Sequence, residues 1–220
     1  MKTGTKSLNG FTLTELLVVI ATIGILAALL LPIMSQVRAM KLNSGCVSNL
    51  KNIGMATQQF VNDNEGRLPG PAWVGLPFEV EDIDADNLPH YLQRYLKEAP
   101  VNGRLLTFLC PGYDYYAPRP PPHRERVSLM ANTDANPQIK VVRPFGYPLR
   151  WGIPPKPPLK LSDLETFGSL ADIFAVTDAD KKNSPVNDNP WYQQLPDRTA
   201  HSHHRNELYF DWHVEGRRAR

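Results

Sequence analysis

One stretch of the chain limits its structure more than any other: "GFTLTELLVVIATIGILAALLLP", from Gly10 to Pro32. The part from Phe11 to Leu31 spans about 31 Å as a helix at roughly 1.5 Å per residue, which matches a hydrocarbon core of about 30 Å. The stretch therefore predicts a membrane-spanning helix. Its one carboxylate, Glu15, needs an explanation, because burying an unpaired carboxylate in lipid costs several kcal/mol.

Glu15 has no cationic partner within the apolar run, because no Lys or Arg occurs between Lys6 and Arg38. Cutting the chain after Gly10 would create one, the α-ammonium of Phe11, about one turn away or on a neighbouring chain. An uncleaved anchor helix needs the same hydropathy but does not explain why Gly10 and Glu15 occur together. A secretory signal peptide has a shorter apolar region, about 7–15 residues, and a cleavage site of small residues, and no clear site follows this run.

These residues resemble the processing signal of type IV pilins and pseudopilins of bacteria. In that family a short basic leader ends in Gly, and a membrane prepilin peptidase cuts after it and methylates the new N-terminal Phe. A Glu at the fifth mature position serves subunit packing. The resemblance implies that residues 1–10 are the leader, that Gly10 and Phe11 flank the cleavage and methylation site, and that Glu15 is an assembly residue.

Two further stretches, 46–69 ("CVSNLKNIGMATQQFVNDNEGRLP") and 108–116 ("FLCPGYDYY"), are similar to a large bacterial branch of pilin-like proteins. The C-terminal signature of that branch is a His, nine residues, then Asp-Gly. His201 and Asp211 fit this spacing, but Trp212 replaces the Gly. A Gly permits a tight or positive-φ backbone that Trp disfavours, so the substitution leaves the geometry of this turn open.

Past the apolar run, hydrophobic residues recur at helical spacing, which predicts an amphipathic helix over residues 33–62. Asn, Gly and Pro in "NDNEGRLPGP" are stop signals for this helix. We therefore expect a pilin-like α+β fold: a leader at 1–10, a transmembrane and filament-core helix at 11–32, the 33–62 helix packed on a small antiparallel β-sheet, and a globular α+β head at 63–220 with proline-rich loops. The predicted packing face comprises Ile33, Val37, Met40, Val47, Leu50, Ile53, Phe60 and Val61.

The head is rich in proline, since the chain holds 21 prolines, about twice the average usage. "APRPPPHRER" and "IPPKPP" predict extended surface loops. "NLPHYLQRYLKEAP" predicts a second helix, and "RLLTFLCP", "IKVVRPFG" and "ADIFAVTD" predict strands. The clearest strand pattern is "ELYFDWHVE", whose alternation places Asp211 and His213 on one polar face, about 7 Å apart at roughly 3.4 Å per residue.

Acidic and histidine side chains concentrate near the C-terminus, and they allow two interpretations. They form part of a metal site, with imidazoles suiting zinc and carboxylate oxygens suiting calcium or another divalent ion, or they form a solvated polar edge. No other cofactor is expected. The residues concerned are Asp178, Asp180, His201, Asp211 and His213.

The two cysteines, Cys46 and Cys110, also allow two interpretations: one disulfide if the head lies in an oxidising compartment, or two free, buried thiols. The net charge of +2 at pH 7 gives no general attraction to nucleic acid, and we predict no specific nucleic-acid partner. No Gly-rich phosphate loop, Cys-x-x-Cys or His-Glu-x-x-His motif occurs, and we expect no enzymatic activity.

The resemblance implies a structural subunit of a type IV pilus-like or type II secretion pseudopilus filament. Its partners would be prepilin peptidase, other pilin-like subunits, an inner-membrane assembly platform and the membrane. The precursor would cross the inner membrane once with its head outside the cytoplasm, and it would enter a periplasmic or cell-surface filament. The alternative is a membrane-anchored extracytoplasmic module that binds polysaccharide or another extracellular polymer through the basic tail "RRAR" and aromatic residues such as Trp73, Tyr115 and Tyr116.

Overall fold

The chain is organised as two compact units. The first ends at Lys41, and the second, Leu42–Arg220, is called the head unit below. The computed structural model describes residues 12–80, 86–96, 98–116, 127–132, 143–149, 154–184, 192–201 and 203–219.

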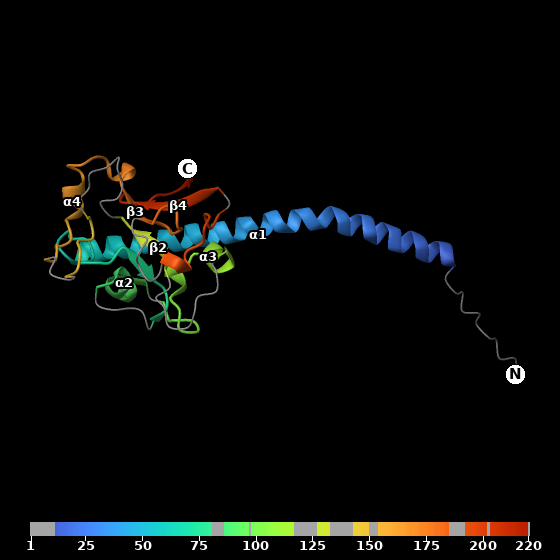
Figure 1. Ribbon diagram of the computed structural model, residues 1–220, viewed down its shortest axis with the longest axis horizontal. Coiled ribbons are helices and arrows are strands. Elements are labelled where there is room, and N and C mark those ends of the chain that lie inside the picture. The colour runs from blue at the N-terminus through green and yellow to red at the C-terminus, as the bar shows by residue number, and fades with distance from the viewer. Residues whose placement is uncertain are drawn as a thin grey trace, which may run out of the picture. The chain divides into compact units, whose positions relative to one another are not determined.

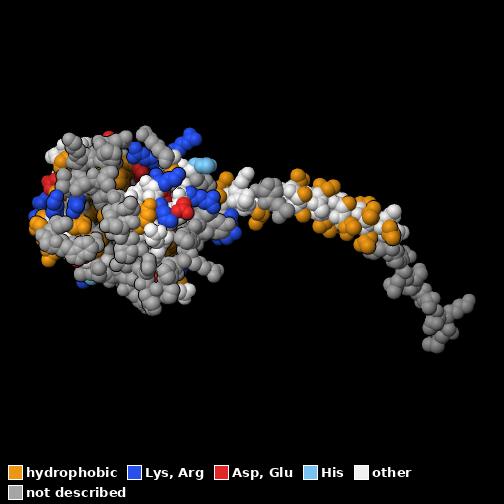
Figure 2. All heavy atoms as spheres, viewed as in Figure 1, with side chains coloured by type: hydrophobic (Ala, Val, Ile, Leu, Met, Phe, Trp, Pro, Cys, Tyr) orange, Lys and Arg blue, Asp and Glu red, His pale blue; other side chains and the backbone are white. Residues whose placement is uncertain are grey.

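A single long helix, α1 (Leu13–Asp63), begins in the apolar run and ends one residue from the predicted boundary. The space-filling view shows hydrophobic side chains along its N-terminal part (Figure 2). Leu17, Ile20 and Leu26 are each more than half exposed there. Among the described residues, α1 is the one helix that is long and apolar enough to cross a membrane. A long apolar N-terminal helix is thus present, as expected for a transmembrane helix or signal anchor.

The buried face of α1 begins inside the head unit. Cys46, Leu50 and Ile53 are fully buried at spacings of four and three residues, as helical periodicity requires. Val37 and Met40 were assigned to this face by the same periodicity, but they are 52% and 68% exposed. The prediction was wrong for these two residues, because the pattern identifies an apolar face without showing where along the helix the head starts.

The head unit contains a five-stranded sheet in which all neighbouring strands are antiparallel and the spatial order follows the sequence. This confirms the expected α+β layout of a long N-terminal helix with a small antiparallel sheet. The strands are β1 (Gly75–Pro77), β2 (Val127–Ala131), β3 (Phe174–Asp178), β4 (His204–Tyr209) and β5 (Val214–Arg218).

Within the head unit, α1 contacts the sheet on one side and the helix α2 (Leu88–Leu96) on another (Figure 1). A Cβ atom at Gly54 would lie 3.0 Å from Cδ1 of Leu208, so glycine lets α1 approach β4 closely. On the α2 side, the ring of Phe60 makes edge contacts with Tyr91 and Tyr95 at centroid distances of 6.1 and 5.7 Å. The existence of α2 confirms the prediction made from "NLPHYLQRYLKEAP".

Several short elements differ from the predictions. "RLLTFLCP" contains the 3-10 helix η2 (Leu106–Phe108) and is not a strand, whereas "ADIFAVTD" contains β3 as expected. Of "IKVVRPFG", only 143–146 is described, and it forms a turn; β1 and β2 were missed. The proline-rich stretch 117–126 and residue 153 lie outside the described residues, while 154–157 is exposed. The remaining short helices are α3 (Pro111–Tyr116), α4 (Leu161–Leu164), η3 (Leu170–Asp172) and η4 (Tyr192–Gln194).

The stretch "ELYFDWHVE" is a β-hairpin and not the single strand that its alternation predicted. β4 ends at Tyr209 and β5 begins at Val214, with Asp211 and His213 in the turn between them. Trp212 adopts φ +72°, the left-handed conformation that the Gly of the branch signature would favour. Its indole N–H donates to Oε1 of Gln58 on α1, so a contact with the helix helps hold the tryptophan in this backbone conformation.

We expect Trp212→Gly to be more stable than Trp212→Ala by about 1–2 kcal/mol. Both variants lose the indole contacts, but only alanine keeps a Cβ atom in the left-handed conformation. The difference is measured as the shift in urea midpoint of the head in the full-length, detergent-solubilised chain, using pulse proteolysis. Equal midpoints would show that the turn stores no backbone strain.

Candidate functional site

The N-terminus of α1 is capped by reciprocal hydrogen bonds between Thr12 and Glu15. The Thr12 backbone N–H and hydroxyl donate to Oε2 of Glu15 at 2.8 and 2.7 Å, and the Glu15 N–H donates to the Thr12 hydroxyl at 3.3 Å. This is a capping box, which satisfies backbone donors that a helix start otherwise leaves unpaired. The predicted cleavage residues Gly10 and Phe11 lie outside the described residues.

The capping box gives Glu15 a local role that the sequence reasoning missed, although the Thr-x-x-Glu spacing carries its signature. A threonine hydroxyl and a backbone amide are neutral groups, so they stabilise the carboxylate without cancelling its charge. The cap therefore explains the position of Glu15 at the helix start. A charged Glu15 placed in lipid would still need a cationic partner.

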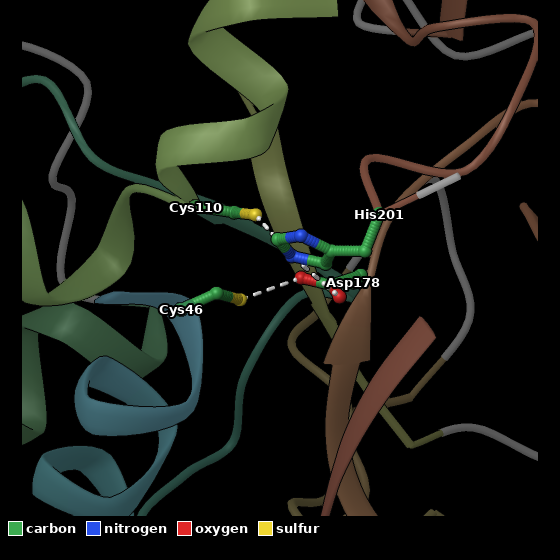
Figure 3. A group of neighbouring side chains, drawn as sticks. All are labelled: Cys46, Cys110, Asp178 and His201. Atoms are coloured by element: carbon green, nitrogen blue, oxygen red, sulfur yellow. Dashed lines mark hydrogen bonds and ion pairs between the residues drawn. The ribbon is translucent and has the colours of Figure 1, made fainter. Parts of the chain in front are cut away.

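A second group of polar side chains lies inside the head unit. Cys46 of α1, Cys110 from the loop before α3, Asp178 at the end of β3 and His201 from the segment before β4 point toward one another (Figure 3). All four are buried, and their ligand atoms lie within 4.8 Å of one another. Cys46 Sγ is 2.9 Å from Asp178 Oδ1, Cys110 Sγ is 3.2 Å from His201 Nε2, and His201 Nε2 is 3.4 Å from Asp178 Oδ2. We call these four residues the buried cluster.

Neighbouring polar groups fix Cys110 in this position. Its backbone N–H donates to the hydroxyl of Ser128 on β2 at 2.9 Å. The Asn49 amide on α1 donates to the carbonyls of Leu106 and Leu109 at 2.7 and 2.9 Å, which ties the loop before Cys110 to the helix. The loop thus has partners on both the sheet and α1.

Small residues beside the cysteines allow the segments to meet. A Cβ atom at Gly112 would lie 2.5 Å from the carbonyl oxygen of Ala200 and 3.0 Å from Cε1 of His201. A Cβ atom at Gly45 would lie 3.2 Å from the ring of Pro111. Neither space accommodates a larger residue without a shift of the backbone or the ring, so these glycines set the approach of α1, α3 and the His201 segment.

Burial and close polar contacts shift the pKa values of three side chains in the buried cluster. A hydrogen bond with Cys110, burial and the negative charge of Asp178 all raise the pKa of the Cys46 thiol. Burial raises the pKa of Cys110 and lowers the pKa of His201. These shifts favour neutral thiols and a neutral imidazole. Asp178 accepts hydrogen bonds from the Cys46 thiol and, at 2.7 Å, from the Asn206 backbone N–H.

Of the five residues named for a metal site or polar edge, Asp178 and His201 lie together in the buried cluster. Asp180 forms a two-point ion pair with Arg205 at 2.6 and 2.9 Å instead. Asp211 and His213 lie in the β4–β5 turn, where Oδ1 of Asp211 is 2.5 Å from Nδ1 of His213. The metal-site interpretation thus applies to Asp178 and His201, whereas Asp211 and His213 form a partly exposed pair in the turn, as the polar-edge interpretation expects.

Cys46 and Cys110 are both free and buried, which was one of the two expected states, but the sequence did not place them beside Asp178 and His201. No local motif joins them to the other two members of the cluster: 132 residues separate Cys46 from Asp178, and 91 separate Cys110 from His201.

No protein-family model, curated protein or solved structure matches the chain.

Proposed function

We propose that the chain is a pilin-like structural subunit that prepilin peptidase cuts after Gly10 and methylates at Phe11. The subunit then enters a type IV pilus-like or pseudopilus filament, with its N-terminal helices in the filament core. Before assembly, the precursor spans the inner membrane once with its head unit outside the cytoplasm. Its partners are the peptidase, other pilin-like subunits and the assembly platform.

The observation that carries the proposal is a single glutamate in the first turn of α1, four residues after Phe11 of the Gly10–Phe11 junction, in an apolar stretch with no other charged residue before Arg38. A membrane anchor alone needs neither Glu15 nor Gly10. In a filament, the carboxylate of one subunit and the Phe11 α-ammonium of its neighbour offset part of the desolvation that each charge suffers. The exposed apolar side chains along the first unit supply a surface for helix-to-helix packing.

A membrane-anchored binding module is the second hypothesis, and it requires no cleavage. Of the aromatic residues that motivated it, Trp73 is half-buried and packs its ring edge against Tyr147 at a centroid distance of 5.1 Å. The guanidinium of Arg143 lies 4.0 Å from the centroid of the Tyr147 ring. An arrangement of aromatic and basic groups is compatible with polymer binding, and a filament subunit can also carry it.

The expected mature N-terminus is N-methylated Phe11. Mass spectrometry of the N-terminal peptide is compared between cells with an active prepilin peptidase and cells that lack it. We expect methylated Phe11 in the first case and the intact leader in the second. An intact leader in both strains would overturn the proposal and leave the anchored module as the better hypothesis.

A further inference from the structure

The buried cluster combines donor atoms that are costly to bury together without a cation. Asp178 and the side chain of His201 are at most 2% exposed, and both cysteines are fully buried. A buried carboxylate needs a charge partner or several hydrogen bonds. Arg205, a basic residue on β4 beside β3, is paired with Asp180.

We propose that Cys46, Cys110, Asp178 and His201 form a four-ligand structural site for zinc. The set offers two sulfurs, one imidazole nitrogen and one carboxylate oxygen, which are the donors that zinc takes in proteins. Calcium requires six to eight oxygen ligands, and one carboxylate among two thiols does not provide them. Zinc is therefore preferred over the calcium that the acidic residues alone suggested.

The spacing of the donor atoms supports four-coordinate binding. Zinc bonds of about 2.0–2.3 Å in a tetrahedron place ligand atoms about 3.3–3.8 Å apart. The separations of 3.2 and 3.4 Å at His201 fall close to this range. The 2.9 Å contact between Cys46 and Asp178 is shorter, so binding replaces that hydrogen bond with two metal–ligand bonds. As each sulfur binds the metal, its thiol releases one proton to solvent.

The site would connect the part of α1 that lies within the head unit to the sheet and the loops around it. Its ligands come from α1, the loop before α3, the end of β3 and the segment before β4, and these are joined by long stretches of chain. Four protein ligands leave no open position for substrate, which is typical of structural and not catalytic zinc. Gly45 and Gly112 allow the backbone segments to come close enough for this arrangement. The zinc site does not depend on whether the chain enters a filament.

The first test measures metal and thiol state together. The full-length chain is purified in detergent through a tag that does not bind metal, and its zinc content and alkylatable thiols are counted. We expect about one equivalent of zinc per chain and thiols that react only after denaturation with a chelator. Cys110→Ser and His201→Gln should each leave the chain with clearly less than one equivalent of zinc, because each removes a ligand and the loss of even an outer-shell partner costs about tenfold in affinity. The matched control is the double variant Asp211→Asn/His213→Gln. It replaces one acidic residue and one histidine outside the buried cluster, and it should keep its zinc.

A second test needs no variant and so does not depend on variants folding. Zinc is removed from the wild-type chain with a chelator, and protease resistance of the head is measured before and after metal return. Zn²⁺ should restore resistance, and Co²⁺ should give the thiolate charge-transfer absorption of a tetrahedral site, while Ca²⁺ and Mg²⁺ do neither. A Cys46–Cys110 disulfide in the exported chain, free thiols with no zinc uptake by the folded chain, or full zinc content in Cys110→Ser would overturn the proposal.

Discussion

Glu15→Val is expected to leave a chain that is inserted, cut at Gly10 and normally folded in its head unit, but absent from filaments. The substitution removes the carboxylate that would pair with the Phe11 α-ammonium of the neighbouring subunit. Because that α-ammonium is then left unpaired in lipid, the incoming subunit loses several kcal/mol of stabilisation and its register contact. Wild type and variant are compared for membrane level, protease resistance of the head, N-terminal mass and abundance in sheared filaments.

Glu15→Gln separates the charge from the helix cap. A glutamine side chain can accept the hydrogen bonds that Thr12 donates, so this variant keeps the capping box and loses only the negative charge. We expect Glu15→Gln to be as defective in filament entry as Glu15→Val. If the glutamine variant assembles like wild type and only the valine variant fails, Glu15 acts as a cap and the charge-pair mechanism is wrong.

Arg205→Met is expected to lower the unfolding free energy of the head by about 3–5 kcal/mol, the largest effect we predict for a substitution in the head. Asp180 is 1% exposed, and its two oxygens accept from the Arg205 guanidinium at 2.6 and 2.9 Å. Methionine retains the length of the side chain but leaves a buried carboxylate without its cation. The urea midpoint of the full-length chain measures the loss.

Lys181→Met is the matched control for this buried pair. Lys181 also pairs with a carboxylate, at 2.8 Å, but its partner Asp197 is 86% exposed, so the pair contributes about 0–1 kcal/mol. The double variant Arg205→Met/Asp180→Asn should lose less than the sum of the two single changes, because it removes both charges. Similar midpoints for Arg205→Met and Lys181→Met would show that burial does not strengthen the Asp180 pair.

The parts of the fold that the sequence predicted depend on long regular patterns. The apolar run and the periodicity through Leu50 and Ile53 specify α1, and the spacing of Leu and Tyr residues specifies α2. The hairpin was mistaken for a single strand because apolar and polar residues continue to alternate from Leu208 to Val214 across the turn. In addition, Trp212 occupies the position at which a glycine would mark the turn. The contact of Trp212 with Gln58 on α1, which helps hold the backbone at positive φ there, is not local in sequence.

The candidate site was predictable only in part, for a different reason. Asp178 and His201 were identified by residue type, but their partners could not be. Cys46 and Cys110 reach them through tertiary packing, and the glycines that permit this packing have no sequence signal of their own. Asp180 and Asp211 are also aspartates, so residue type alone does not distinguish them from Asp178. Their different roles follow from the folded structure, in which Asp180 pairs with Arg205 and Asp211 lies in the β4–β5 turn.

The most direct measurement is the amount and N-terminal mass of this chain in filaments sheared from cells with and without an active prepilin peptidase. A filament subunit predicts chains that begin with N-methylated Phe11 in the sheared fraction, and no chains in that fraction when the peptidase is absent. Chains that keep the leader through Gly10 and stay in the membrane fraction of both strains would contradict it.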